Sequence, residues 1–339
     1  MGRGRGGRTS HARPLQLHGE VTVDPLVAGQ IVVAAAQDLL FACAAGTLAC
    51  SALCARGEPS GGASSHAAVV ERAHASAGSP GRVRAIALIG LMLACCLYLW
   101  LQAAVMSGST FSAAAPAISV VLTQSHFGAA WSVGCAGAVL GCLGGTRDSR
   151  AAWWLAALGM LVYAAGKAAA SHAADTGDFT VREAVHVVHL TATALWAGSV
   201  IVAAPLLWRW RRAAAMPPMQ CEAFCTRLSH LATLALVVVI GSGIYNAAQD
   251  TAHLSGPLLD AWYGRVLTVK LVFVALAVLL GGYNRMIHLP RLHATAIEGG
   301  DAYRDAQRRF DRLLSVEAIA MIAVLIAAAV LGHTAPTGG

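Results

Sequence analysis

Histidines are the residues of this sequence best placed for chemistry, because several of them lie at the ends of apolar segments. His186 and His189 are three residues apart, which places them on one face of a helix. His172 lies a short loop upstream, and His126 opens an earlier apolar segment. Imidazole binds copper, zinc, iron and nickel. The pattern predicts a metal site of His172, His186 and His189, with His126 as a candidate fourth ligand.

A second group of candidates consists of ionisable residues inside apolar segments, where a charge is costly. Lys270 and Asp38 fall at similar predicted depths, so they either form an ion pair or line a transport pathway. Trp196 continues the face of His189 two turns deeper and is the third pathway candidate. Lys167 lies near a segment end and can reach water. Glu317 lies one turn into the last segment, beside a basic loop whose arginines are expected to pair with it.

Other motifs are less specific. Cys221 and Cys225 lie one helical turn apart and are a candidate pair for capturing Cu(I), whereas the remaining cysteines are interpreted as small packing residues. Glu183 with His186 gives Glu-x-x-His, but no second copy supports a di-iron carboxylate site. The sequence contains no nucleophile elbow, phosphate-binding glycine loop or His-Glu-x-x-His motif. It therefore does not predict an enzyme.

The elements that must position these residues are membrane-spanning helices. Apolar residues make up 57% of the 339, and charged residues only 12%, about half the share usual in a soluble domain. Segments long enough to cross a bilayer recur along the chain. The sequence therefore predicts an all-α, polytopic transmembrane bundle of about eight helices. The apolar windows cover residues 27–53, 85–106, 115–145, 151–171, 184–208, 228–248, 264–283 and 313–332.

The chain is expected to consist of a basic N-terminal tail (1–26), three transmembrane helices (27–146) and a transmembrane core (147–335). Segment 107–125 is rich in Ser, Ala and Thr and is expected to form an outer loop or a re-entrant turn, although the apolar window opens at 115. The mixed charges of residues 302–312 predict a helix that leads into the last span.

Basic residues give the bundle a predicted orientation. The formal net charge is +7, and arginines concentrate in alternate loops. The positive-inside rule places these loops in the cytoplasm and both termini outside, although the Arg-rich first 13 residues favour the opposite side. Because the basic charge follows the topology, nucleic-acid binding is not predicted. The histidine group then lies at the outer face.

Several segments, in order, resemble the copper resistance protein D (CopD-type) family of inner-membrane proteins. The similarity extends over residues 165–332 and is weaker upstream. One marker is His189 followed seven residues later by Trp196. The segments are Ser171-His172-Ala173, HLTATALWAGS, RLSHLATLALVVVIGSGIYNA (227–247), YGRVLTVKLVF (263–273), GGYNRMIHLPRL (281–292) and Glu317.

The resemblance implies a bacterial inner-membrane protein that moves or handles copper between periplasm and cytoplasm. It also implies a separate periplasmic copper-binding partner of the copper resistance protein C type. Ser199 departs from the family pattern, where a second Gly is usual, and His230 extends the Arg-x-Ser motif. The positions that match the family are His172, His189, Trp196, Tyr245, Lys270, Asn284 and Glu317.

Two other functions are compatible with the same residues. Histidines on facing helices hold iron in membrane b-type cytochromes, so a haem electron-transfer protein is the alternative. The rim position of the histidines argues against two stacked haems, but not against one. A scaffold that binds copper without transporting it is the third.

Overall fold

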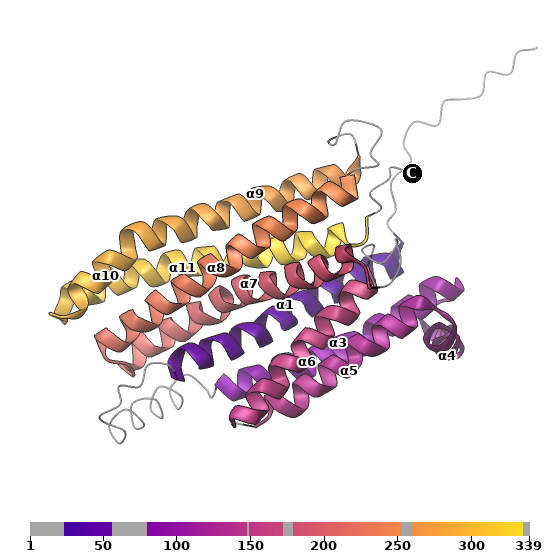
Figure 1. Ribbon diagram of the computed structural model, residues 1–339, viewed down its shortest axis with the longest axis horizontal. Coiled ribbons are helices and arrows are strands. Elements are labelled where there is room, and N and C mark those ends of the chain that lie inside the picture. Colours follow the sequence, from indigo (N-terminus) through magenta and orange to yellow (C-terminus); the bar gives the residue numbers. More distant parts are fainter. Residues whose placement is uncertain are drawn as a thin grey trace, which may run out of the picture.

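The structure is a computed structural model, and it describes residues 24–55, 80–147, 149–171, 179–251, 259 and 261–334. The predicted basic tail and His172 lie outside these residues, except for the last three positions of the tail. Eight helices are long and apolar enough to cross a membrane, which confirms the predicted all-α transmembrane bundle (Figure 1). They are α1 (Pro25–Ala55), α3 (Pro80–Ser107), α5 (His126–Gly145), α6 (Arg150–Ala169), α7 (Val181–Ala213), α8 (Pro218–Thr251), α9 (Trp262–Tyr283) and α11 (Gly300–Leu331).

The remaining elements lie at the ends of these helices. A 3-10 turn, η1 (Phe111–Ala113), and the short helix α4 (Ala115–Gln124) connect α3 to α5. At the opposite end, α9 continues through a π-helical turn, η3 (Asn284–His288), into α10 (Leu289–Ala296). The predicted helix over 302–312 is confirmed as the first part of α11.

The predicted apolar window 115–145 starts too early, whereas the predicted loop or re-entrant segment 107–125, followed by a span that opens at His126, agrees with η1, α4 and α5. The chain is extended at Ser125, whose hydroxyl accepts a hydrogen bond from the Gly128 amide at 3.0 Å and caps α5. This cap ends α4 and starts the span at His126. The polar residues Thr123 and Gln124 just before the cap mark the break in the sequence.

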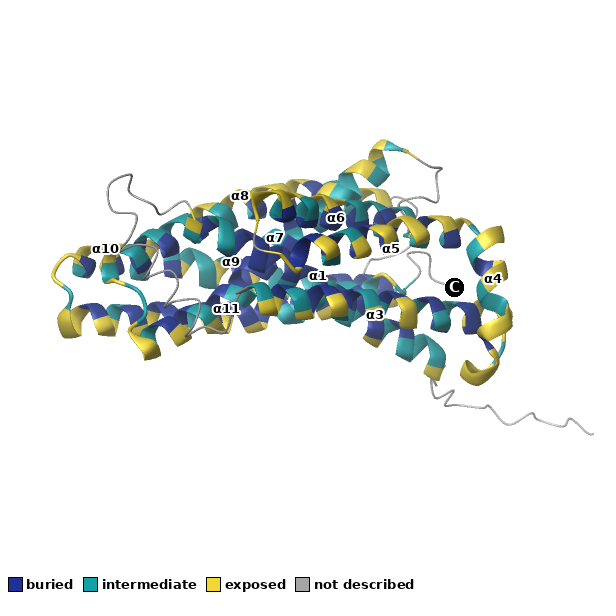
Figure 2. Ribbon diagram, turned by 90° about the horizontal axis from the view of Figure 1, so that it is seen from below, coloured by how far each residue is buried: buried dark blue, intermediate teal, exposed yellow. Residues whose placement is uncertain are grey.

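Helices α1 and α7 form the centre of the bundle. In each of them 56% of the most apolar stretch is buried, against 17% in α9. Helix α1 packs on α3 and α7, while α7 packs on α8 and α11. Helices α5 and α6 pair along their length on the α3 side, and α9 packs on α11 at the other side (Figures 1 and 2).

Glycines bring two helix pairs into backbone contact. Gly46 of α1 lies against Gly198 of α7, and a Cβ added at either position would overlap the facing backbone. Gly137 of α5 and Gly159 of α6 make a similar crossing. Such small-residue contacts are typical of membrane helices, where close van der Waals packing drives association.

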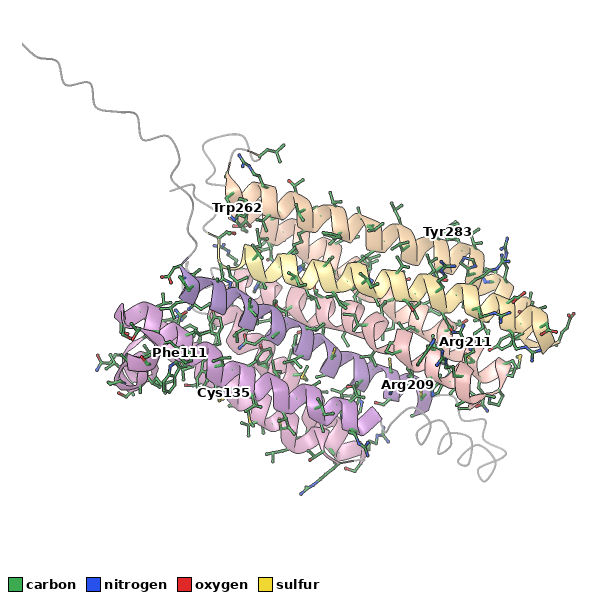
Figure 3. All side chains as sticks on the ribbon, turned by 180° about the vertical axis from the view of Figure 1, so that it is seen from behind. Phe111, Cys135, Arg209, Arg211, Trp262 and Tyr283 are labelled. Carbon is green, nitrogen blue, oxygen red and sulfur yellow. The ribbon has the colours of Figure 1, made fainter. Side chains whose placement is uncertain are left out.

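The two ends of the bundle differ in charge. We call one the arginine-rich end and the other, where α5, α7 and α9 begin, the arginine-poor end. Figure 3 shows Arg209 and Arg211 at the first, and Phe111 and Trp262 at the second. The arginine-rich end carries Arg82, Arg84, Arg147, Arg150, Arg209, Arg211, Arg212, Arg227, Arg285, Arg291, Arg304, Arg308, Arg309 and Arg312.

The expected ion pair between Asp38 and Lys270 is wrong. The carboxylate of Asp38 on α1 pairs instead with the ammonium group of Lys167 on α6, and both side chains are largely buried. The two residues meet because α6 runs towards the arginine-poor end and brings Lys167 to the depth of Asp38. Lys167 therefore pairs within the bundle rather than extending to water.

Replacing Lys167 with Met is expected to destabilise the bundle by about 3 kcal/mol, because the Asp38 carboxylate would lose its partner in an apolar environment. The double variant Asp38→Asn/Lys167→Met removes both charges and should recover most of that loss. Thermal unfolding of the purified variants in detergent measures both effects. Equal stability of the single variant and the wild type would contradict this account.

Candidate functional site

The candidate site starts at the first turns of α7, which are fixed by a capping arrangement. The Thr180 hydroxyl accepts from the Glu183 amide at 3.2 Å, and the Glu183 carboxylate accepts from the Phe179 amide at 2.8 Å. Glu183 therefore caps the helix, which accounts for the Glu-x-x-His spacing without a metal. The helix continues without interruption through His186 and His189.

His186 and His189 lie side by side and face α8. Their rings are nearly parallel, with centroids 6.4 Å apart and an interplanar angle of 22°. His189 Nδ1 lies 3.0 Å from the Ser242 hydroxyl, and His186 Nδ1 lies 3.2 Å from the Asn246 amide nitrogen. Each ring is thus held through Nδ1 by a side chain of the neighbouring helix.

The Ser242 hydroxyl determines which nitrogen of His189 carries the proton. It donates to the Val238 carbonyl at 2.6 Å, so it accepts from Nδ1–H of His189. The lone pair of His189 is then on Nε2. Histidines that bind metals usually have the other ring nitrogen held in this way.

Gly243 makes room for the imidazole of His189. A Cβ at this position would lie 3.1 Å from ring atom Cε1, which is tighter than ordinary van der Waals contact. The glycine of the Ser-Gly-x-Tyr segment therefore has a steric role, because it allows the ring to lie against α8.

Substituting Gly243 with Ala is expected to displace the His189 ring from Ser242 and to weaken metal binding about 10- to 100-fold, the range typical when a supporting group is lost. Titration of the purified protein with copper against a competing chelator measures the change. Gly241→Ala is the matched control, since nothing lies within 4 Å of a Cβ added there. The account fails if both variants bind copper as the wild type does.

The candidate fourth ligand, His126, is not assembled with this pair. His126 opens α5, which packs on α3, α4 and α6, whereas His186 and His189 face α8. His172 lies outside the described residues. Within the residues that the structure describes, no three His, Cys, Asp or Glu side chains gather as a metal site. The imidazole pair is the part of the predicted set that the structure brings together.

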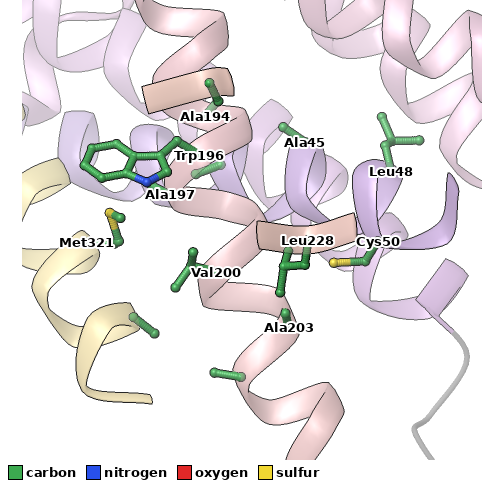
Figure 4. Packing of buried hydrophobic residues seen from close by; sticks show 14 of the residues in the cluster. Ala45, Leu48, Cys50, Ala194, Trp196, Ala197, Val200, Ala203, Leu228 and Met321 are labelled. Atoms are coloured by element: carbon green, nitrogen blue, oxygen red, sulfur yellow. The ribbon is translucent and has the colours of Figure 1, made fainter. Parts of the chain in front are cut away.

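Below the pair, buried side chains of α7 and α11 continue towards the arginine-rich end. Trp196 is 2% exposed and lies beside Met321, which is fully buried (Figure 4). Glu317 lies one turn before Met321 on α11, closer to the arginine-rich end. Its carboxylate lies against Gly281 of α9, where an added Cβ would be 2.7 Å from Oε1. Among the described residues Glu317 has no ion pair, so the expected arginine pairing is wrong.

Lys270 lies near this pair. It is within electrostatic range of His189, as is His186. The ammonium group of Lys270 and the imidazole of His189 therefore influence each other, although they come from α9 and α7. Asp38 lies elsewhere, with Lys167 between α1 and α6.

The partners of the histidines on α8 were not predicted from the sequence. Ser242 and Asn246 are four residues apart and thus share one helix face, which was the available signal. The contact between Tyr98 and His333, whose hydroxyl and Nε2 atoms are 3.0 Å apart, was not predicted either. That contact joins residues far apart in sequence, so no local spacing could indicate it.

Two family models match different parts of the chain. "Copper resistance protein D-like, N-terminal domain" matches residues 23–181, and "Copper resistance protein D" matches residues 222–331. The matches together include every described membrane-spanning helix except most of α7 and the first turn of α8, and the second contains Ser242, Asn246, Lys270 and Glu317.

One curated relative is the "Inner membrane protein YebZ" of Escherichia coli (strain K12). It is 29% identical over 134 residues, a match that covers 35% of this chain and 42% of that protein. The chain thus spans less than half the length of that relative. No solved structure matches the chain.

Proposed function

Because the chain belongs to the copper resistance protein D family, we propose that it transports copper across the bacterial inner membrane. Copper is the cargo, and no catalytic step is assigned to the protein. The observation that carries the proposal is the pair of stacked imidazoles on α7, each held at Nδ1 by a residue of α8. His189 can offer its Nε2 lone pair to copper at the arginine-poor end, and His186 can offer Nε2 once the Asn246 amide turns its oxygen towards Nδ1.

In this proposal copper enters at the arginine-poor end, which faces the periplasm. The positive-inside rule supports the orientation, since the arginine-rich end then lies in the cytoplasm. The inner membrane is suggested by the name of the Escherichia coli relative. His172 stays a predicted ligand, His126 on α5 is not part of this capture site, and a periplasmic protein of the copper resistance protein C type is the proposed copper donor.

The proposed route follows the buried face of α7 and α11. From His189 it passes Trp196 and Met321, whose thioether is a soft donor, and reaches the Glu317 carboxylate. Lys270, within electrostatic range of His189, repels a bound cation, which keeps copper from being held too tightly to leave. Asp38 contributes less to the electrostatics of the route, because Lys167 balances its charge.

Copper accumulation in cells that express the full chain tests the proposal. Cells with the wild type should differ in copper content and copper sensitivity from cells with a His172→Ala/His189→Ala variant at equal membrane abundance. Equal copper content and equal sensitivity would overturn the assignment of these histidines to capture.

The haem alternative is less consistent with the geometry of the pair. Axial ligation in a membrane cytochrome takes histidines from facing helices, whereas His186 and His189 share one face of α7 and meet Ser242 and Asn246 on α8. The absorption spectrum of the purified protein separates the two functions. A Soret band would favour the haem protein, and bound copper without that band would favour transport.

A further inference from the structure

A pair of buried thiols lies at the opposite end of the bundle from the histidines. Cys221 and Cys225 are one turn apart at the start of α8, and each is only 1% exposed. Their i, i+4 spacing in α8 places both side chains on one face of the helix, so the two sulfur atoms lie on the same side.

Both thiols belong to the apolar core of the bundle, but polar side chains of α11 also lie next to them. The Gln307 amide on α11 donates to Cys221 Sγ at 3.5 Å. Asp311, one turn further along α11, is 3% exposed and within electrostatic range of Cys225. Among the described residues neither carboxylate oxygen of Asp311 has a partner in hydrogen-bond geometry, and its charge is balanced by an ion pair with Arg211.

A basic residue lies next to the pair. Arg211 Nη1 is 3.3 Å from Asp311 Oδ2. The nearby carboxylate of Glu222 is turned to other partners, because it accepts from Thr226 at 2.7 Å and lies 3.1 Å from His293 Nδ1. The two sulfur atoms are thus available as donors for a metal, while the nearby Tyr303 hydroxyl donates to the Pro218 carbonyl at 3.5 Å.

We propose that Cys221 and Cys225 form a two-coordinate Cu(I) site near the arginine-rich end, from which copper leaves the bundle. Thiolates favour Cu(I) over harder ions, and a two-coordinate site needs no third ligand. The inference rests on copper transport as the function, and it places the last binding site of the route at these two cysteines. The imidazole pair and the thiol pair then mark its two ends.

Charge balance is consistent with this site. Binding of one Cu⁺ replaces two thiol protons and forms two Cu–S bonds, so the neutral dithiol becomes a complex with a net charge of −1 and two protons are released. Asp311 is placed to accept one of these protons, and the other goes to water. Arg211 beside the site supplies the positive charge that a buried anionic complex requires. The copper stays Cu(I), so no electron donor is needed.

The test is anaerobic loading of the purified full-length protein with Cu(I), followed by X-ray absorption at the copper edge and titration against a chromogenic Cu(I) chelator. We expect sulfur scattering from bound copper in the wild type. The variant Cys221→Ser/Cys225→Ser should lose one tightly bound copper ion and that sulfur signal. The matched control Cys95→Ser/Cys142→Ser removes two cysteines of α3 and α5 and should retain both.

Copper bound by the wild type with nitrogen or oxygen neighbours only would overturn the thiol site, and this result does not depend on whether any variant folds. Equal losses in the thiol variant and the control would also overturn it. The measurement needs no transport. A sulfur signal in a protein that does not move copper would therefore uphold the site while contradicting the proposed function.

Discussion

Replacing His186 and His189 together with Ala is expected to weaken copper binding at the arginine-poor end by more than about 100-fold. Loss of a single supporting group around a metal typically costs 10- to 100-fold, and this variant removes both imidazoles themselves. The remaining groups at the site, Ser242, Asn246 and Lys270, provide no strong copper donor. Titration of the purified protein against a competing copper chelator measures the loss.

The matched control for this variant is His230→Ala/His288→Ala, which removes two histidines near the arginine-rich end. The control should retain the copper affinity of the wild type at the imidazole pair. If both double variants lose the same copper affinity, any pair of histidines in the protein contributes equally to copper binding. The imidazole pair is then not a specific copper site. An unchanged affinity in the His186→Ala/His189→Ala variant contradicts the assignment directly.

Substitution of Gly198 with Leu is expected to have the largest effect on the fold. Even a Cβ at this position would overlap the Ala42 carbonyl of α1, and Gly46 lies in the same crossing. Overpacking of a tight contact usually costs 1–3 kcal/mol, and here backbone faces backbone, so we expect about 3 kcal/mol or more. The crossing joins the two central helices, and its separation should lower the unfolding temperature and the yield of monodisperse protein.

The control for this prediction is Gly241→Leu on α8, where nothing lies within 4 Å of an added Cβ. It introduces the same side chain into another membrane-spanning helix and should leave the unfolding temperature unchanged. Equal stability of Gly198→Leu and the wild type would show that α1 and α7 do not pack as described.

Most of the architecture could be predicted because the bilayer imposes a length and a composition on every span. The break before α5 was predicted from the polar segment 107–125, although the apolar window 115–145 alone does not record that Ser125 caps a new helix. The partner of Asp38 was missed. Predicted depth alone cannot distinguish Lys167 from Lys270, because the choice depends on which helices are neighbours.

The candidate site could be predicted only in part. The three-residue spacing of His186 and His189 indicated a shared face, and the structure brings the two rings together. Their anchors on α8 depend on the register between α7 and α8, which no single segment encodes. The separation of His126 has the same cause, since α5 packs with α6 and α3 rather than against α8.

Copper uptake into proteoliposomes is the measurement that tests the central claim most directly. Purified protein is reconstituted into copper-free vesicles, and the copper that enters is followed with an enclosed chelating dye. We expect time-dependent uptake with the wild type and uptake close to that of empty vesicles with His186→Ala/His189→Ala. Uptake by the wild type no faster than leakage into empty vesicles would contradict the proposal that this protein transports copper.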